Sequence, residues 1–440
     1  MTLIGKIRAL SLQSEIQRRM EFYTQPFVRE EREEIQLQKF NELWQGISRS
    51  VPWYREKTET KVLPGVFTSW EQFRGLMPVN NRQVCADNLQ SMTDLRTPPD
   101  YLRATSGSTA GSMKFPAWNS ENQVTRPDMW VGRAWHGIQP EDRCFYFWGQ
   151  PTLFENGIKG KINTQIRLLK DRWLGYQRLI IFDLTDEDYQ RAGQDMIRFK
   201  PSYLVGFSTA LERLAYVIKK SASSVQDIHL KGIVATGEKF NTLDSQRMLE
   251  EVFHCPVIME YGSNETDVMA CTISNGTYAV FWENYFLELI DSPQGDQKEL
   301  LVTSLYPRCF PLIRYRIGDK VELLEQDEGI PYGLSRFKNV LGRSRDFIEM
   351  PGGHHIHPSA FQIALRGFPD LITQIQLIAL SEGVRIEVLS PLDVLPEQLT
   401  NEIHRRLGLV NPGLREVEIR VVKQLRQTPT GKTPIIWREK

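Results

Sequence analysis

The chain has 440 residues, of which 41% are hydrophobic and 25% are charged. This length predicts two or three domains, and this composition excludes a disordered or fibrous protein. Its 54 basic and 54 acidic residues give a formal net charge of zero without a polybasic stretch, which disfavours nucleic acid as a partner.

The first fifty residues have a helical pattern. Apolar residues recur every three or four positions, at Leu12, Ile16, Met20, Tyr23 and Phe27 and again at Phe40, Leu43 and Ile47. Pro26 interrupts the pattern, so we expect two helices. We interpret the charged run 29–34 as a solvated helix face; an acidic interaction site is the alternative.

From about residue 100, short apolar runs alternate with helical segments. The strand-like runs are 179–182, 203–205, 232–235 and 257–259, and the helical segments are 186–198, 209–219 and 242–253. This alternation predicts an α/β fold with parallel strand pairing. Helical periodicity then fades between residues 278 and 325, where 286–290 and 300–303 suggest antiparallel strands.

The last hundred residues have the pattern of a separate small unit. Residues 376–380 and 384–388 flank Ser381-Glu382-Gly383 and predict a hairpin. A helix with Leu399, Ile403 and Leu407 on one face follows, and then an alternating strand at 417–421. We therefore expect a large N-terminal α/β domain, 1–341, with sheets flanked by helices, and a small C-terminal α+β domain, 342–440.

Cellular location is indicated by two absences in the sequence. No apolar run approaches the roughly 18–20 residues that span a bilayer, and no secretory signal is evident. The five cysteines are scattered and form no Cys-x-x-Cys pair, which favours a reducing compartment. We expect a cytoplasmic protein without a membrane partner, and the sequence leaves open whether it forms a homodimer.

A loop rich in hydroxyl groups and glycine follows the strand-like run 101–104. It contains Thr105, Ser106, Gly107, Ser108 and Thr109, and Lys114 follows closely. Backbone N–H groups and hydroxyls in such a loop can converge on a polyphosphate, and a nearby lysine adds charge. A flexible surface loop is the alternative interpretation.

The loop is not a Walker motif. That motif needs Gly-x4-Gly-Lys-Ser/Thr, and Gly111 is followed by Ser112. Gly431-Lys432-Thr433 imitates the end of the motif, but residue 426, where its first glycine belongs, is arginine. Kinase or GTPase chemistry is therefore disfavoured.

Five further segments rich in glycine and polar residues follow in chain order, at 235–239, 260–266, 314–319, 342–346 and 429–432. In this order and at these spacings, the set resembles the adenylate-forming superfamily of acyl-CoA synthetases, peptide-synthetase adenylation domains and luciferases. The amino-acid sequence around Glu283 and at 314–319 is most similar to the phenylacetate–coenzyme A ligase branch of this superfamily. The resemblance spans residues 100–440.

The resemblance implies a nucleotide site. Tyr261 would stack on adenine, Asp319 would accept both ribose hydroxyls, and Arg343 would reach the ribose or phosphates. A core tyrosine, an exposed turn aspartate and a surface arginine are the respective alternatives. The residues assigned in this way to ATP or AMP are Thr105, Ser106, Gly107, Ser108, Thr109, Lys114, Thr236, Gly237, Glu238, Tyr261, Gly262, Ser263, Asn264, Asp319 and Arg343.

Two residues are expected to act on the phosphates, and both are implied by the resemblance. Glu265 would hold Mg²⁺, which prefers oxygen ligands. Lys432 would stabilise the charge that develops on the α-phosphate, by about 4 kcal/mol at about 4 Å and an effective dielectric near 20. A solvated C-terminal lysine is the alternative.

A mobile C-terminal domain follows from the same expectation, because Lys432 must enter for adenylation and leave before a thiol reacts. The hinge would lie beside Gly342-Arg343. The family carries its hinge carboxylate where this chain has Arg345, and Asp346 is next. The phosphate loop also departs from the family, with Ala110 in a position that is usually glycine.

We predict no zinc site. Some relatives carry a cysteine and histidine cluster, but Cys271 and Cys309 have no neighbouring cysteine pair. His354, His355 and His357 follow a Pro-Gly-Gly sequence, and we interpret them as solvated loop histidines.

The acid pocket is implied by the resemblance to lie near two segments of aromatic and small residues. These are Tyr146, Phe147 and Trp148, and then Gly206, Phe207 and Ser208. Flat apolar walls favour an aryl or arylacetic acid over a long fatty chain, although each aromatic residue fits a plain core equally well.

The resulting hypothesis is an AMP-forming carboxylate–CoA ligase of aromatic or secondary metabolism. Its co-substrates would be ATP, coenzyme A and a small aromatic acid of the benzoate, anthranilate or phenylacetate kind, with Mg²⁺. One alternative keeps adenylation but transfers the acyl group to an amine, a sugar or a protein thiol. The other is a non-catalytic nucleotide-binding relative.

Overall fold

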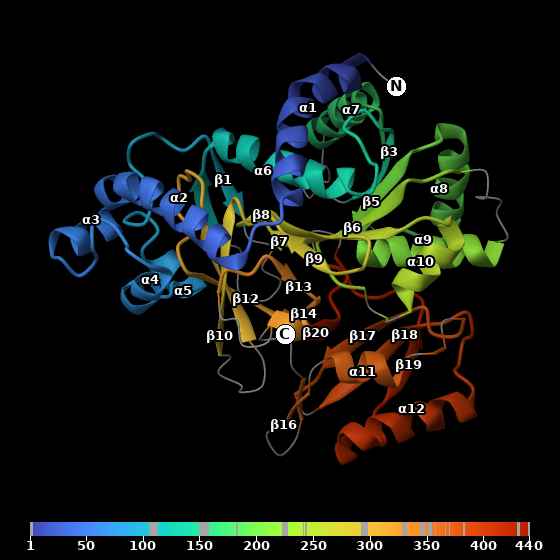
Figure 1. Cartoon of the computed structure of the whole chain (residues 1–440). Helices are drawn as coiled ribbons and strands as arrows, with labels where there is room; N and C mark the ends of the chain where they lie inside the picture. The colour runs from blue at the N-terminus through green and yellow to red at the C-terminus, as the bar shows by residue number, and fades with distance from the viewer. Residues whose placement is uncertain are drawn as a thin grey trace. The chain divides into compact units, whose positions relative to one another are not determined.

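The computed structural model divides into two compact units. Figure 1 shows the chain coloured by residue number. The first unit comprises Met1–Ser11, His136–Met259 and Asp346–Lys440, and the second comprises Leu12–Trp135 and Glu260–Arg345. The structure describes residues 3–104, 113–148, 158–181, 184–221, 228–240, 242, 244–291, 298–327, 332–343, 348–350, 354–356, 358–365, 367–368, 370–381, 383–428 and 432–438.

The first unit contains a parallel sheet of strand order β4-β3-β5-β6-β7. Its strands are β3 (Cys144–Phe147), β4 (Tyr176–Leu179), β5 (Tyr203–Phe207), β6 (Gly232–Thr236) and β7 (Val257–Ser263), which continues into the second unit. The pairs β3–β4, β3–β5 and β5–β6 are parallel. The predicted parallel pairing is thereby confirmed.

Helices connect these strands in sequence. They are α7 (Ile158–Leu174), α8 (Asp186–Phe199), α9 (Ser208–Ser221) and α10 (Ser245–Phe253). Helix α8 begins at a capping box in which Thr185 and Asp188 exchange hydrogen bonds, and it ends at Lys200 in the left-handed conformation. Every residue of β5 is buried, as expected for a strand that is covered on both faces. The α/β class predicted from the sequence is confirmed.

The C-terminal segment of the first unit has a hydrophobic core of its own. Strands β17 (Gln374–Ala379) and β18 (Val384–Leu389) form the predicted antiparallel hairpin. Helix α12 (Glu397–Val410) buries the predicted side chains Leu399, Ile403 and Leu407 in this core. We call residues 346–440 the C-terminal module.

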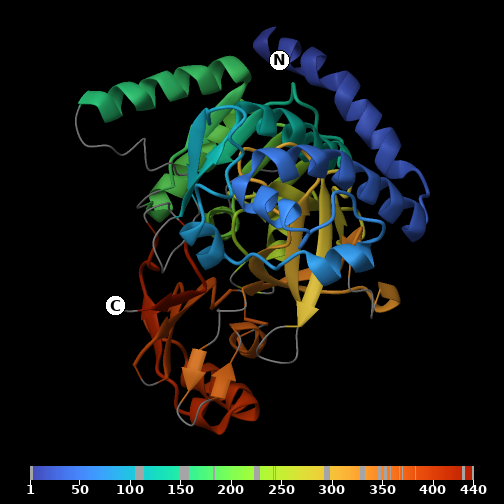
Figure 2. The same ribbon diagram turned by 90° about the vertical axis from the view of Figure 1, so that its left-hand side faces the viewer.

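The other elements of the C-terminal module surround this core. Strands β19 (Ile419–Val422) and β20 (Ile436–Arg438) pair in parallel with β18 and β17. The hairpin of β15 (Ile348–Met350) and β16 (His354–Ile356) lies beside α12, as Figure 2 shows. Helix α11 (Pro358–Ala364) completes the core.

The second unit is helical at its N-terminal end. Helices α1 (Leu3–Thr24, which begins in the first unit) and α2 (Arg29–Ser50) leave a break around Pro26, as predicted. Three shorter helices follow, α3 (Pro52–Glu59), α4 (Trp70–Leu76) and α5 (Arg82–Asp87). Their aromatic core includes Phe40, Trp44 and Trp70, and the ring of Trp70 stacks on that of Phe286.

The strands of the second unit are mainly antiparallel. One sheet has the order β10-β11-β12-β14, from β10 (Tyr285–Asp291), β11 (Lys298–Ser304), β12 (Tyr315–Glu322) and β14 (Asn339–Arg343). The end of β7 continues through β8 (Asp267–Thr272), β9 (Tyr278–Val280) and β13 (Arg336–Phe337). The antiparallel pair predicted at 286–290 and 300–303 is β10–β11 and is confirmed.

A hairpin and a helix complete the second unit. Strands β1 (Tyr101–Ala104) and β2 (Lys114–Ala117) pair antiparallel, and helix α6 (Asn119–Ala134) follows. A 3-10 turn, Glu325–Asp327, follows β12. Within the described ranges, we find no helix with the length and apolarity that a bilayer crossing requires.

Candidate active site

A turn at the end of β6 carries three of the predicted residues, Thr236, Gly237 and Glu238. Gly237 has a φ of +81°, and a Cβ atom built on it would lie 3.1 Å from the ring of Phe207 and 3.6 Å from Lys432 Nζ. A side chain there would be strained and crowded, so this turn requires glycine. The carbonyl of Gly237 is therefore accessible to a close partner.

Lys432 is that partner. Its Nζ atom donates a hydrogen bond to the Gly237 carbonyl oxygen at 2.8 Å and lies 5.5 Å from the centroid of the Phe207 ring. The next backbone N–H, of Thr433, donates to Glu238 Oε2 at 3.1 Å. Within the first unit, the structure thus brings the predicted Lys432 together with the predicted Gly237, Glu238 and Phe207.

Aromatic and hydroxyl side chains adjoin this contact. The rings of Trp148 and Phe207 lie 4.4 Å apart, centroid to centroid. Ser208 Oγ donates to the Glu238 carbonyl oxygen at 2.8 Å. Three of the six residues predicted for the acid pocket therefore adjoin one another, and one of them, Phe207, lies next to Lys432.

The other three pocket residues contact different neighbours. Phe147 is fully buried in the core. A Cβ atom built on Gly206 would lie 2.8 Å from the Cβ atom of Phe147. Tyr146 projects from the opposite face of β3, and its ring packs 5.0 Å from that of Tyr176. Gly206 and Phe147 thus set the spacing of β3 and β5 behind Phe207.

The carboxyl group of Glu238 is electrostatically unusual. Burial raises its pKa to about 7, although hydrogen bonds from Thr209 and the charge of Lys432 act in the opposite direction. Thr209 contributes both its hydroxyl and its backbone N–H to Glu238 Oε1, the latter at 3.2 Å. A carboxyl group with this pKa changes its charge near neutral pH.

The second unit brings together three residues that were assigned to the nucleotide. Tyr261 is buried, and its hydroxyl donates to Asp319 Oδ2 at 2.9 Å. Asp319 on β12 lies opposite Arg343 on β14 in the antiparallel register. The ring of Tyr261 meets that of Phe337 edge to face, 5.7 Å away.

The end of β7 contains the predicted Gly262 and Ser263, and the turn that leads to β8 contains Asn264 and Glu265. A Cβ on Gly262 would lie 1.9 Å from the carbonyl oxygen of Asp267, so the strands approach too closely there for any side chain. The Ser263 hydroxyl accepts the Glu265 N–H at 3.1 Å and closes the turn, while Asn264 is exposed.

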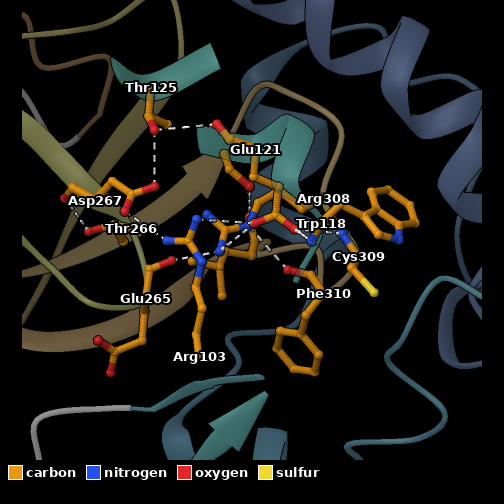
Figure 3. Close-up of polar contacts among 12 residues, drawn as sticks. Arg103, Trp118, Glu121, Thr125, Glu265, Thr266, Asp267, Arg308, Cys309 and Phe310 are labelled. Atoms are coloured by element: carbon orange, nitrogen blue, oxygen red, sulfur yellow. Dashed lines mark hydrogen bonds and ion pairs between the residues drawn. The ribbon is translucent and has the colours of Figure 1, made fainter. Parts of the chain in front are cut away.

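A cluster of buried charges, which the sequence analysis did not identify, holds this turn (Figure 3). Arg308 donates to the Glu265 carbonyl oxygen at 2.6 Å and forms an ion pair with Glu121 at 3.5 Å. Arg103 pairs with Asp267 at 2.7 Å. The carboxylate of Glu265 points away from the cluster in Figure 3. The cluster therefore fixes the Glu265 backbone and leaves its carboxylate for another role.

No sequence signal identifies this cluster. Arg103, Glu121 and Arg308 occupy no motif, and their charges resemble those of solvated surface residues. Glu121 is held in the interior by the hydrogen bonds that its Oε1 accepts from the backbones of Trp118, at 2.9 Å, and Cys309, at 3.0 Å. These contacts span up to 188 residues of the chain.

A cavity of about 490 Å³ adjoins the same turn. It is lined by polar residues of the second unit, namely Tyr101, Arg103, Asn119, Asn122, Ser263, Asn264 and Asp267. Two of these were assigned to the nucleotide from the sequence. The cavity therefore offers hydrogen-bond donors and acceptors at two of the residues that were assigned to the nucleotide.

Magnesium fits the donor chemistry of this turn. Within the described residues, there is no group of three or more histidine, cysteine, aspartate or glutamate side chains that could hold a metal ion. Mg²⁺ is often bound by one or two carboxylates and the phosphates of a substrate. Glu265 can supply one such carboxylate.

Two of the three histidines that were expected in a loop lie in a strand. His354 and His355 belong to strand β16, because they pair across the hairpin with Met350 and Glu349. The loop prediction is therefore wrong for these two, and His357 lies outside the described residues.

Several predicted residues lie outside the described structure. They are Thr105, Ser106, Gly107, Ser108 and Thr109 of the phosphate loop and Arg345 and Asp346 of the hinge. Lys114 is exposed at the start of β2, opposite Ala104. For Arg343 the backbone is described, and its side chain is not.

Two curated proteins are similar in sequence, and no family model matches the chain. Protein CapK of Staphylococcus aureus is 24% identical over 322 residues, which cover 72% of this chain and 69% of CapK. Phenylacetate-coenzyme A ligase of Pseudomonas putida is 25% identical over 168 residues, which are 36% of this chain and 36% of that protein.

Solved CoA ligases are similar in structure. A 2-hydroxyisobutyryl-CoA ligase in the postadenylation state matches with a TM-score of 0.71 and 16% identity, over 93% of this chain and 90% of that chain. A benzoate CoA ligase from Burkholderia xenovorans matches with a TM-score of 0.52 and 16% identity, over 77% and 69%. The chain therefore has the fold of the adenylate-forming CoA ligases, which confirms at the level of the fold the resemblance drawn from its motifs.

Proposed function

We propose that the chain is an AMP-forming carboxylate–CoA ligase, which activates an aromatic carboxylic acid as its acyl-adenylate and transfers the acyl group to coenzyme A. The observation that carries this proposal is the 2.8 Å contact between Lys432 Nζ and the carbonyl of Gly237. This contact brings the ammonium group of Lys432 to the turn that the motif resemblance assigns to the nucleotide.

In the first half-reaction, a carboxylate oxygen attacks the α-phosphorus of ATP and pyrophosphate leaves. Negative charge then builds up on the non-bridging oxygens of the α-phosphate. The ammonium of Lys432 stabilises this charge, by about 4 kcal/mol at a separation near 4 Å and an effective dielectric near 20. A magnesium ion held by Glu265 would neutralise the charge of the phosphates.

In the second half-reaction, the thiol of coenzyme A attacks the acyl carbonyl and AMP leaves. The bond between the acyl carbon and the phosphate oxygen breaks, and its electron pair leaves with the phosphate of AMP. We assign Lys432 no role in this step, because the ammonium must leave before a thiol can reach the acyl carbonyl. We propose that the C-terminal module then moves about a hinge at Arg345 or Asp346, so that the thiol can approach.

The choice of an aromatic acid rests on Trp148 and Phe207. Their rings lie next to each other and, through Phe207, next to Lys432. Flat apolar rings favour a flat apolar substrate. The names of the relatives include both benzoate and 2-hydroxyisobutyrate, so they support a small acid and do not select between the two.

The test is pyrophosphate exchange into ATP, driven by a panel of benzoates, phenylacetates, hydroxy acids and fatty acids. We expect one aromatic group of acids to drive exchange and Lys432→Ala to lower it by roughly two to three orders of magnitude. Thioester formation from supplied acyl-adenylate should be largely preserved. Lys423→Ala, an exposed lysine of the same module, is the matched control.

Three outcomes would contradict the proposal. Exchange with none of the acids would favour the non-catalytic alternative, and equal loss of both half-reactions in Lys432→Ala would contradict the two-pose mechanism. Consumption of coenzyme A is measured by mass spectrometry. Pyrophosphate exchange without this consumption would favour an amine, a sugar or a protein thiol as the acceptor.

A further inference from the structure

The turn Gly237-Glu238 is bonded on two sides, both within the first unit. On one side it is attached to the start of helix α9, where Ser208 Oγ donates to the Glu238 carbonyl oxygen at 2.8 Å. Thr209 donates its hydroxyl and its backbone N–H to Glu238 Oε1. A carboxylate is well placed there because the first N–H groups of a helix lack partners in the helix.

On the other side, the same turn contacts two successive residues of the C-terminal module. Lys432 Nζ donates to the Gly237 oxygen at 2.8 Å, and the Thr433 N–H donates to Glu238 Oε2 at 3.1 Å. The two oxygens of one carboxylate thus face different partners. Oε1 is attached to helix α9, and Oε2 is attached to the module.

The loop that presents Lys432 is organised by the module itself. The side chain of Gln376 on β17 donates to the carbonyl oxygens of Arg426, at 2.9 Å, and Pro434, at 3.0 Å. Thr428 closes the loop, because it exchanges hydrogen bonds with the backbone of Lys432 at 2.8 and 3.1 Å. The described residues on either side, Thr428 and Lys432, can therefore stay bonded to each other when the contacts with the turn break.

Other contacts between the same two segments involve both neutral and charged donors, the latter including Lys219, whose Nζ pairs with Asp370 at 3.2 Å. Gln374 donates to the Thr209 carbonyl oxygen at 2.6 Å and to Glu212 at 2.9 Å. Gln362 donates to the Phe240 carbonyl oxygen at 3.1 Å. The glutamine bonds lie beside the turn and leave the direction of the Lys432 side chain to the contacts made at Gly237 and Glu238.

We propose that Glu238 is a positioning residue for adenylation: its carboxylate, anchored to helix α9 by Thr209, holds the Thr433 N–H and so keeps the Lys432 ammonium at the turn. This role rests on the proposed function, because it concerns the pose in which Lys432 acts. It differs from nucleotide binding, the role that the motif resemblance gave to Glu238. Breaking the bond to Thr433 is then one of the steps by which the module leaves after adenylation.

The test compares the two half-reactions in Glu238→Gln, which has the same shape but one acceptor fewer. We expect the maximal rate of pyrophosphate exchange to fall roughly tenfold, the usual effect of losing a hydrogen bond to a charged group. The KM values for ATP and the acid, and the rate of thioester formation from supplied acyl-adenylate, should stay the same. Glu416→Gln, an exposed glutamate of the module, is the matched control.

The anchor provides a second variant pair. Thr209→Val removes the hydroxyl that fixes Glu238 and should slow adenylation without slowing thioester formation. Thr209→Ser retains the hydroxyl, so its adenylation rate should stay close to that of the wild type. A general loss of structure would lower both half-reactions and would not distinguish valine from serine. Equal effects of the two variants would overturn the anchoring role.

Hydrogen–deuterium exchange gives a readout that does not require activity. In Glu238→Gln, amide exchange in peptides that cover 426–434 should be faster than in the wild type and in Glu416→Gln. Unchanged amide exchange in residues 426–434 would overturn the proposal, whether or not the protein activates any acid. If the wild type catalyses pyrophosphate exchange and Glu238→Gln does so at the same rate, the positioning role is refuted and the proposed function stays intact.

Discussion

The pKa of Glu238 predicts how the stability of the first unit depends on pH. Burial raises this pKa from 4.5 to about 7, so the folded protein binds the proton more tightly than the unfolded chain does. Between about pH 4.5 and 7 the folded state therefore carries more protons. Its stability must fall as the pH rises through this window.

The size of the effect follows from the shift. Each pKa unit corresponds to about 1.4 kcal/mol, so ionising Glu238 costs the folded state about 3 kcal/mol by pH 8. Glu238→Gln removes the titration, and its neutral amide, like the protonated carboxyl group, makes a weaker bond to Thr433. The stability of the variant relative to the wild type should therefore rise by about 3 kcal/mol between pH 4 and pH 8.

Thermal unfolding at a series of pH values measures this difference. For a unit of this size, a change of 3 kcal/mol corresponds to a shift of roughly 6–12 °C in the melting temperature of the variant relative to the wild type. Glu416→Gln should show no such trend. A difference between Glu238→Gln and the wild type that stays constant with pH would refute the argument, because the carboxyl would then titrate normally in the folded protein.

Three further variants test other parts of the site. Gly262→Ala places a methyl group against backbone and should lower the free energy of unfolding by about 3 kcal/mol in denaturant titrations, whereas Gly75→Ala, in helix α4 and with no atom within 4 Å, should not lower it. Arg133→Met removes the 2.7 Å ion pair of the buried Glu260 and should cost about 3–5 kcal/mol in the same assay. Glu265→Gln should raise the Mg²⁺ concentration required for half-maximal pyrophosphate exchange, and an unchanged requirement would contradict its ligand role.

The central strands could be predicted because their physical signal is local. The segments 203–205 and 232–235 are continuous apolar runs between helical segments, and both lie in fully buried parts of parallel strands. The segment 146–148 gave a different interpretation, since its aromatic residues suggested the wall of a pocket. Two of these residues belong to β3, and an apolar run of this length has the same pattern in a strand as in a pocket wall.

The contacts of the site could not be predicted in the same way. The motif resemblance identified Lys432 and Gly237, but the hydrogen bond between them joins residues 195 positions apart. Whether an ammonium meets a carbonyl across that separation depends on the packing of the C-terminal module. The charges of Arg103 and Arg308 present the same difficulty, since only the folded structure shows that they are buried.

The kind of contact made at the turn agrees with a lysine that has to arrive and depart. Lys432 and Thr433 contribute two hydrogen bonds to Gly237 and Glu238, and water can replace each of them when the segments separate. A broad apolar contact at the same place would stabilise one pose by the burial of its whole area and would oppose release. A carboxyl group with a pKa near 7 adds a second way to weaken the contact, because protonation of Glu238 removes the charge that favours the Thr433 N–H. Adenylation should therefore slow below about pH 7 in the wild type, and in Glu238→Gln this part of the pH profile should be flat.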